Sequence, residues 1–180
     1  MRRVLAALLA VALVALGGLA LAEAPYADYA GEYEFASGAG WWATWLFVNP
    51  DGSFYGHFED SDYMEGTLDG ASYEQVLYNC DFTGALSQPE YSDGKRLICR
   101  VERLDYEVGD PYVADGIRYE PTESYGLALD DQLCFYSAGA QRSALPEGLT
   151  SWLWFLEDDA QIVTFQTLYT ETWDAGFSCI

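Results

Sequence analysis

The sequence contains a single histidine, His57, and only eight lysine and arginine residues in a chain of 180. One histidine cannot supply a His-rich zinc site, because such sites need several imidazole ligands. No Gly-x-Ser-x-Gly motif and no nucleophile in a catalytic setting accompany it, which argues against a histidine-dependent hydrolase. We therefore interpret His57 as a surface residue.

The few basic residues stand against 29 acids, so the formal net charge is −21. Binding to nucleic acid and to anionic membranes depends on lysine and arginine side chains, so neither is expected as a partner. An acidic surface instead favours solubility, cations and basic protein partners. High net charge is also typical of disorder, but aromatic residues make up 16% of this chain, enough to build a core.

Long hydrophobic runs are absent after Ala22. Before that residue, two arginines are followed by an apolar run that ends in Ala-Leu-Ala, a small-residue cleavage pattern. We predict a secretory signal peptide over residues 1–22, cleaved near Ala22; an uncleaved membrane anchor is the alternative, since the run is just long enough to span. Residues 23–180 should then form one secreted, extracellular domain without a membrane attachment.

Helical periodicity is almost absent from residues 23–180. Short alternating runs rich in Tyr, Phe, Trp, Val and Thr are separated by Gly, Asp, Pro and Ser, which indicates an all-β domain. We predict either a single antiparallel barrel or a two-sheet sandwich, with one short helix in LPEGLTSWLWF, where Pro146 lies in the first turn. Strands are expected at 32–35, 41–48, 53–58, 73–84, 95–106, 116–119, 132–137 and 162–170.

The stretch FVNPDGSFYGHFEDSD, residues 47–62, predicts a hairpin in detail. Asn-Pro-Asp-Gly favours a type I turn with Gly52 in the left-handed position of a G1 bulge, which makes a three-residue loop. That loop pairs Val48 with Phe54 and, further along, Trp42 with Asp60, on one face of the sheet. This face is the more apolar, so the hairpin should deliver Trp42 and Asp60 side by side at the open end of the core.

The predicted binding site lies at this open end. We expect Trp42, Thr44 and Asp60 to border a pocket for a small molecule or glycan. Asp60 and Asp62, with Asp69 further along, form a plausible oxygen-ligand site for Ca²⁺, although their spacing does not fit an EF-hand. A solvated acidic loop is the alternative, and no other cofactor is expected.

The opposite face of the hairpin carries Trp45, Phe47 and Tyr55 together with His57. Either a second layer covers these side chains or they form an exposed aromatic patch, which would call for a partner.

The four cysteines all follow the predicted signal peptide. An even number in an exported chain indicates disulfides. Of the three possible connectivities we favour Cys80–Cys99 with Cys134–Cys179, because a hairpin with Cys80 opposite Cys99 would place apolar residues on the cysteine face. Four buried free thiols are the alternative.

Four segments of the chain are informative: SGAGWWATWLFVNPDGSFYGHFEDSD, NCDFTG, DGIRYEPTESYGL and ALPEGLTSW. Together they resemble a family of uncharacterised secreted or lipid-anchored proteins from Gram-positive anaerobes. The resemblance implies a secreted protein and no particular activity, and this chain departs from many relatives in lacking a lipid-anchor cysteine. The order of Gly-x-Trp, Asp-Gly hairpin and Gly-x-aromatic strand also resembles avidin-type and lipocalin-like barrels, which implies a closed barrel that holds a small ligand.

These features predict a secreted, monomeric binding module for a small ligand, a glycan or a cation, acting without catalysis. A cell-surface structural or interaction protein that uses its acidic exterior and aromatic face is the alternative. A carboxylate-dependent hydrolase is a second alternative, which the sequence does not favour because 29 acids always place some pair at a suitable spacing.

Overall fold

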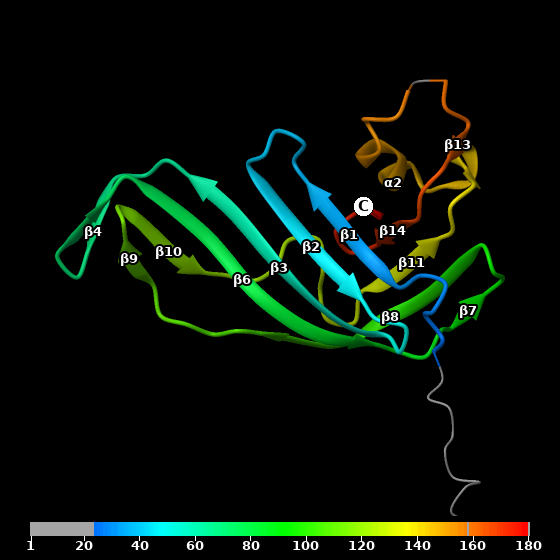
Figure 1. The fold of residues 1–180 in the computed structure, drawn as a ribbon, viewed down its shortest axis with the longest axis horizontal. Helices are drawn as coiled ribbons and strands as arrows, with labels where there is room; N and C mark the ends of the chain where they lie inside the picture. The colour runs from blue at the N-terminus through cyan, green and yellow to red at the C-terminus, as the bar shows by residue number, and fades with distance from the viewer. Residues whose placement is uncertain (1–23, 158, 180) are drawn as a thin grey trace, which may run out of the picture.

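The computed structural model describes residues 24–157 and 159–179, so the predicted signal peptide lies outside the described residues. Eight strands close into an antiparallel barrel, which resolves the choice between barrel and sandwich (Figure 1). Neighbours pair in the order β1–β2–β3–β6–β8–β11–β14–β15, and β15 returns to β1. The barrel strands are Gly31–Ala36 (β1), Trp42–Val48 (β2), Ser53–Asp62 (β3), Gln75–Leu86 (β6), Arg96–Tyr106 (β8), Gln132–Tyr136 (β11), Thr167–Thr170 (β14) and Ala175–Cys179 (β15).

An arm extends from the barrel where β3 and β6 run on beyond their neighbours (Figure 1). Ile117–Pro121 (β10) widens it by pairing parallel to β6, and Tyr112–Ala114 (β9) pairs antiparallel to β10. Gly66–Leu68 (β4) and Ala71–Tyr73 (β5) form a hairpin at its tip. The β10–β6 pair is the one departure from the expected antiparallel arrangement within the described sheets.

A second, smaller layer covers the outer face of β11, β14 and β15 (Figure 1). It consists of Ala140–Gln141 (β12), a 3₁₀ turn at Arg142–Ala144, the helix Glu147–Trp152 (α2) and Ile162–Val163 (β13). The short helix therefore lies where the sequence predicts it. In the part of the chain that the structure describes, no helix has the length and apolar character needed to cross a bilayer.

The last barrel strand, β15, is absent from the sequence-based strand assignment, and the predicted strand at 162–170 is divided into β13 and β14. Gly176 gives β15 the appearance of a turn in the sequence. In the structure this position needs a residue without a side chain, because α2 packs closely against the strand there. A Cβ at Gly176 would lie 2.8 Å from Leu149 Cδ1. A glycine inside a strand often marks such a close approach.

The register of the β2–β3 hairpin is confirmed. Asn49 N donates to Ser53 O at 2.8 Å, and Gly52 has a φ of 85°, as a three-residue loop with a G1 bulge requires. Val48 lies opposite Phe54, and Trp42 lies opposite Asp60.

Two phenylalanine–glycine pairs shape the barrel interior between β3 and β6. Phe82 lies opposite Gly56 and Phe54 lies opposite Gly84, and each ring covers the glycine across from it. A methyl group at Gly56 would collide with the Phe82 ring and with the Trp45 backbone oxygen. The glycines thus make room for the two rings inside the sharply curved sheet.

One end of the barrel is filled by the first described segment. Tyr26 and Tyr29 are buried there with their ring centroids 6.0 and 5.7 Å from that of Phe135. The Tyr26 hydroxyl donates to Ser87 O at 2.6 Å, and its amide donates to Pro50 O at 3.0 Å. Because Pro50 lies in the β2–β3 turn, Trp42 and Asp60 belong to the opposite end.

The predicted disulfides are wrong in this structure, where all four cysteines are free. Cys80 lies opposite Phe58 and Cys99 lies opposite Leu133, so the two do not face each other. The reason is that the turn at 93–94 closes a separate ribbon between Tyr91–Ser92 (β7) and β8, which offsets β8 against β6.

The second predicted pair fails for a different reason. Cys134 packs in the outer cluster under α2, whereas Cys179 borders the barrel core. The barrel wall therefore separates the two sulfurs.

We predict that the thiols of Cys80 and Cys99 resist alkylation in the folded protein. Burial raises the pKa of both to about 12, and the thiolate is the reactive form. Iodoacetamide at about pH 8 should leave both unmodified in the native state and should label all four cysteines after denaturation without reductant. A Cys80–Cys99 cross-linked peptide in a non-reducing map would contradict the structure.

Gly56→Ala should destabilise the barrel by about 1–3 kcal/mol, because the added methyl group overpacks the contact with Phe82. The measurement is the free energy of unfolding from urea denaturation. Gly109→Ala is the matched control, since a Cβ there meets its first neighbour, Pro121, at 3.8 Å. Equal stabilities for the two variants would show that the ring does not need this glycine.

Candidate functional site

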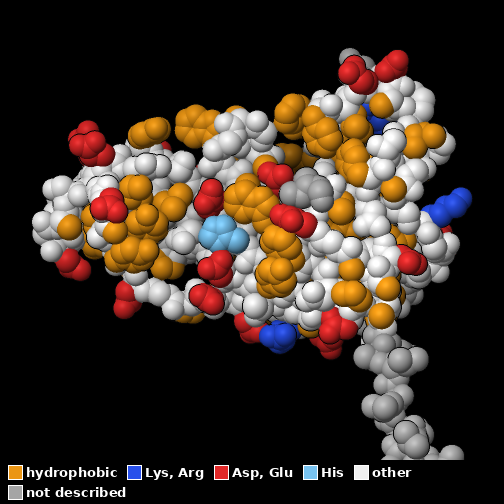
Figure 2. Space-filling view, in the orientation of Figure 1, with side chains coloured by type: hydrophobic (Ala, Val, Ile, Leu, Met, Phe, Trp, Pro, Cys, Tyr) orange, Lys and Arg blue, Asp and Glu red, His pale blue; other side chains and the backbone are white. Residues whose placement is uncertain are grey.

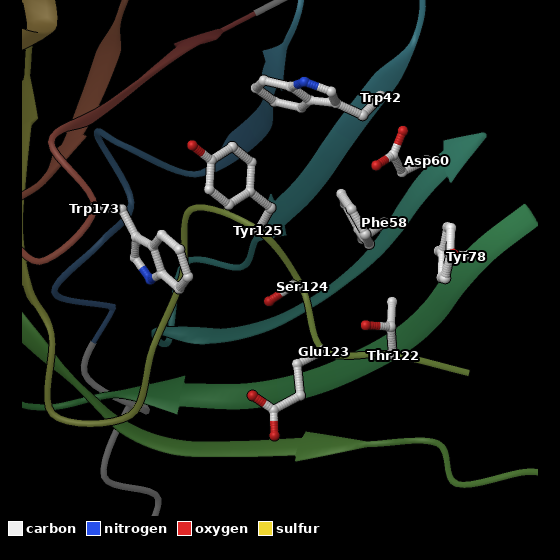
Figure 3. A pocket seen from close by; sticks show the side chains of 9 residues that line it. All are labelled: Trp42, Phe58, Asp60, Tyr78, Thr122, Glu123, Ser124, Tyr125 and Trp173. Carbon is white, nitrogen blue, oxygen red and sulfur yellow. The ribbon is translucent and has the colours of Figure 1, made fainter. Parts of the chain in front are cut away.

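The end of the barrel opposite Tyr26 opens into a cavity of about 630 Å³ (Figure 3). Its walls come from three neighbouring strands, from the chain that follows β10, and from the turn between β14 and β15. The lining residues are Trp42, Phe58, Asp60, Tyr78, Thr122, Glu123, Ser124, Tyr125 and Trp173.

The sheet wall of the cavity is a row of side chains across three strands. Trp42 of β2 lies opposite Asp60 of β3, which in turn lies opposite Tyr78 of β6. Phe58 is two residues before Asp60 and therefore shares its face. Phe58 is buried while Asp60 is half-buried, so this row marks where the filled core gives way to open space.

A strap, residues 122–125, forms the facing wall. Thr122 N donates to Asn79 O at 3.2 Å, which holds the start of the strap on β6. The hydroxyls of Tyr106 and Ser124 lie 3.0 Å apart and share a hydrogen bond. Burial raises the pKa of the Tyr106 phenol.

Thr44 does not line the cavity, contrary to the sequence-based expectation. It is fully buried, and its Oγ1 donates to the backbone oxygen of Tyr125 at 2.7 Å. Its face of β2 was predicted correctly, but the strap lies over it. Thr44 therefore holds the backbone of Tyr125, which forms part of the cavity wall, in place through this hydrogen bond.

The turn at residues 171–174 carries Trp173, which is 40% exposed. Hydrogen bonds to neighbouring segments hold this turn. The buried Asp131 accepts from Thr172 N at 3.0 Å, and the Trp152 ring donates to Asp174 O at 2.8 Å. The Tyr169 hydroxyl donates to Asp174 Oδ1 at 2.6 Å, a bond that raises the pKa of Tyr169 to about 12.

Three of the aromatic rings meet almost at right angles. The centroids of Trp42 and Tyr125 are 4.9 Å apart with an interplanar angle of 82°, and those of Tyr125 and Trp173 are 5.1 Å apart at 85°. Figure 3 shows Phe58 and Tyr78 on the other side of the space from Tyr125 and Trp173. Aromatic surface therefore surrounds the cavity instead of forming one flat platform.

Asp60, Asp62 and Asp69 are not gathered as a Ca²⁺ site would require. Asp62 is exposed on the arm opposite Val76, and Asp69 has a φ of 50° in the two-residue turn between β4 and β5. In residues 24–157 and 159–179, no group of three or more His, Cys, Asp or Glu side chains is arranged to hold a metal ion. This arrangement lends no support to a calcium centre built from these aspartates.

The outer face of the hairpin is a partly exposed aromatic patch, formed by Trp45, Phe47, Tyr55 and His57. Trp45 stacks on His57 and Phe47 stacks on Tyr55, with centroid distances of 6.0 and 4.8 Å. Figure 2 shows apolar side chains on both sides of the single histidine, with acids around them. His57 Nδ1 lies 2.7 Å from Asp81 Oδ1, and Tyr55 is 50% exposed.

Sequence reasoning missed the strap and Trp173. Both belong to loops that are remote in sequence from the hairpin. The strap lies within DGIRYEPTESYGL, one of the segments that carry the family resemblance, but that resemblance implied no site there. One feature of the sequence could have indicated them. Tyr125 and Trp173 are large aromatic residues in otherwise polar connections, where small or polar residues are usual.

Comparisons with protein-family models, curated proteins and solved structures found no match to this chain. The resemblance to secreted proteins of anaerobes stays a prediction. The geometry of the cavity carries the functional inference.

Thr44→Val should loosen the strap. The variant keeps the shape of the side chain but leaves the Tyr125 carbonyl without its donor, at a cost of about 1–3 kcal/mol in unfolding free energy. Amide hydrogen exchange in the strap should accelerate as well. Thr83→Val, on the exposed face of β6, is the control and should change neither quantity; unchanged exchange in Thr44→Val would remove its positioning role.

Proposed function

We propose that the protein is a binding module that holds a small molecule at the open end of its barrel. The observation that carries this proposal is the 630 Å³ cavity with aromatic walls and a few polar groups at its edges. Ligand sites generally have volumes of about 300–1,000 Å³ and this kind of lining. The tethers from Thr44, Tyr106 and Asp131 support it further, because they hold the walls in place before any ligand arrives.

The lining fits binding better than catalysis. Of the nine residues, none is a histidine, lysine or cysteine that could activate a hydroxyl group. A glycosidase would need two carboxyls that flank one bond. Asp60 and Glu123 are the two candidates, and Figure 3 shows them at different edges of the cavity without pointing toward each other.

The aromatic patch on the outer face favours a second candidate function, a surface interaction protein. Phe47 and Tyr55 remain uncovered by the second layer, which lies over other strands. A stacked apolar pair ringed by acids is suited to contact with a partner. This candidate predicts that the patch, and not the cavity, governs binding.

We also propose that the protein is exported and acts outside the cell. The support is the sequence of the N-terminus, with its paired arginines, apolar run and Ala-Leu-Ala pattern, together with the resemblance to secreted proteins. An extracellular ligand would reach the cavity directly, since it opens at the end of the barrel.

A thermal-shift screen of residues 23–180 against cations, glycans and small metabolites tests the cavity proposal. For any compound that raises the melting temperature, calorimetry on Trp173→Ala should show a loss of affinity of about tenfold or more, as for a central aromatic contact. Tyr55→Ala is the matched control, a similarly exposed aromatic residue on the outer patch, and should bind like the native protein. Loss in Tyr55→Ala with no loss in Trp173→Ala would overturn the cavity proposal in favour of the surface interaction protein.

A further inference from the structure

The cavity carries charge of one sign. Asp60 lies at its edge next to Trp42, and Glu123 lies on the strap. None of the nine lining residues is basic. A ligand that enters therefore meets two carboxylates with no fixed cation from the lining to neutralise them.

Arg118 is the basic residue that shares the inner face of the arm with this site, two residues before Glu120 on β10. Its guanidinium is paired with Glu120 and lies over the Tyr73 ring, 5.7 Å from the centroid. Arg118 is thus engaged along the arm. In the sheet Glu120 lies opposite Tyr78, which lines the cavity. Arg118 is two residues before Glu120 on β10, so it lies further from the cavity along the arm.

The aromatic walls add a second attraction for positive charge. The face of an aromatic ring carries partial negative charge and attracts cations, most strongly when water is excluded. Trp42, Tyr125 and Trp173 meet at angles of 82° and 85°, so they form a corner and offer ring surface in more than one direction. A corner of this kind encloses a rounded group, whereas a flat sugar ring stacks best on a single exposed plane.

We propose that the cavity binds an organic cation, an ammonium group with small alkyl substituents, seated among these rings with Asp60 as its counter-charge. This inference rests on the proposed binding function. The substituents pack against Phe58 and Tyr78, and the hydroxyls of the strap accept or donate to a polar tail. The acidic exterior of the protein, with a net charge of −21, raises the local concentration of such a ligand.

A bare metal ion fits the same walls poorly. Calcium takes six to eight oxygen ligands, whereas the lining is dominated by five aromatic side chains. An alkylated ammonium ion, in contrast, gives up little hydration and gains contact with the rings.

The test is calorimetry with choline and with 3,3-dimethylbutan-1-ol, which has the same shape but no charge. Titrations run in about 0.15 M NaCl, so that attraction by distant acids is largely screened. Choline should bind at least about tenfold more tightly than the neutral alcohol, the combined effect of ring faces and a carboxylate.

Two carboxylate variants isolate the counter-charge. Asp60→Asn should weaken choline binding by about five- to tenfold without changing the weak binding of the alcohol. Asp62→Asn is the matched control: it makes the same change two residues further along β3, outside the cavity, and should leave the affinity unchanged. Trp173→Ala should weaken choline in the same way as Asp60→Asn.

The outcomes separate this inference from the function on which it rests. Equal binding of choline and the alcohol, or a neutral disaccharide such as maltose that binds and loses affinity in Trp173→Ala, would overturn the cation while leaving the cavity as the binding site. Equal losses in Asp60→Asn and Asp62→Asn would reduce the effect to general surface charge and also overturn it. If neither choline nor any other compound responds to Trp173→Ala, the proposed function fails together with it.

Discussion

The register of the β2–β3 hairpin is the constraint on which the rest of the structure depends. Pro50 and Gly52 fix a three-residue loop, and the loop determines which side chains of both strands face inward. A slip by one residue would turn one of the two strands over relative to the other. Trp42 and Asp60 would then lie on opposite faces of the sheet, and either Trp45 or His57 would have to enter the core.

The two ends of the barrel differ, and this difference makes a site possible. At one end Tyr26 and Tyr29 are buried and complete the core. At the other end the walls are loops held by hydrogen bonds from buried side chains, among them Thr44 and Asp131. Tethered loops can leave a cavity open because their own polar groups are already satisfied at the points of attachment. A rigid frame of this kind reduces the entropy that a ligand must overcome on binding.

The negative charge of the protein extends into the cavity, because Asp60 and Glu123 line it and no basic residue of the described chain does. Three arginines of β8 and β10 are paired with nearby acids: Arg100 with Glu90, Arg103 with Asp105 and Arg118 with Glu120. Exposed ion pairs of this kind contribute little to stability, but each one neutralises an arginine at the surface. Asp60 and Glu123 remain in the site among aromatic rings, and this lining is the basis for the proposed cationic ligand.

Much of the local structure could be predicted because it is encoded in contiguous residues. Alternating aromatic and polar residues determined the all-β class, Asn49 to Gly52 determined the turn and its register, and that register placed Trp42 beside Asp60. The tertiary structure alone decided what faces them. Tyr125 and Trp173 reach the cavity through long-range pairings, in which β10 runs parallel to β6 and β15 closes the barrel against β1. The β7–β8 ribbon likewise offset Cys80 from Cys99 and removed the expected disulfide. Such pairings depend on how strands pack around a whole barrel, and no short window of sequence contains that information.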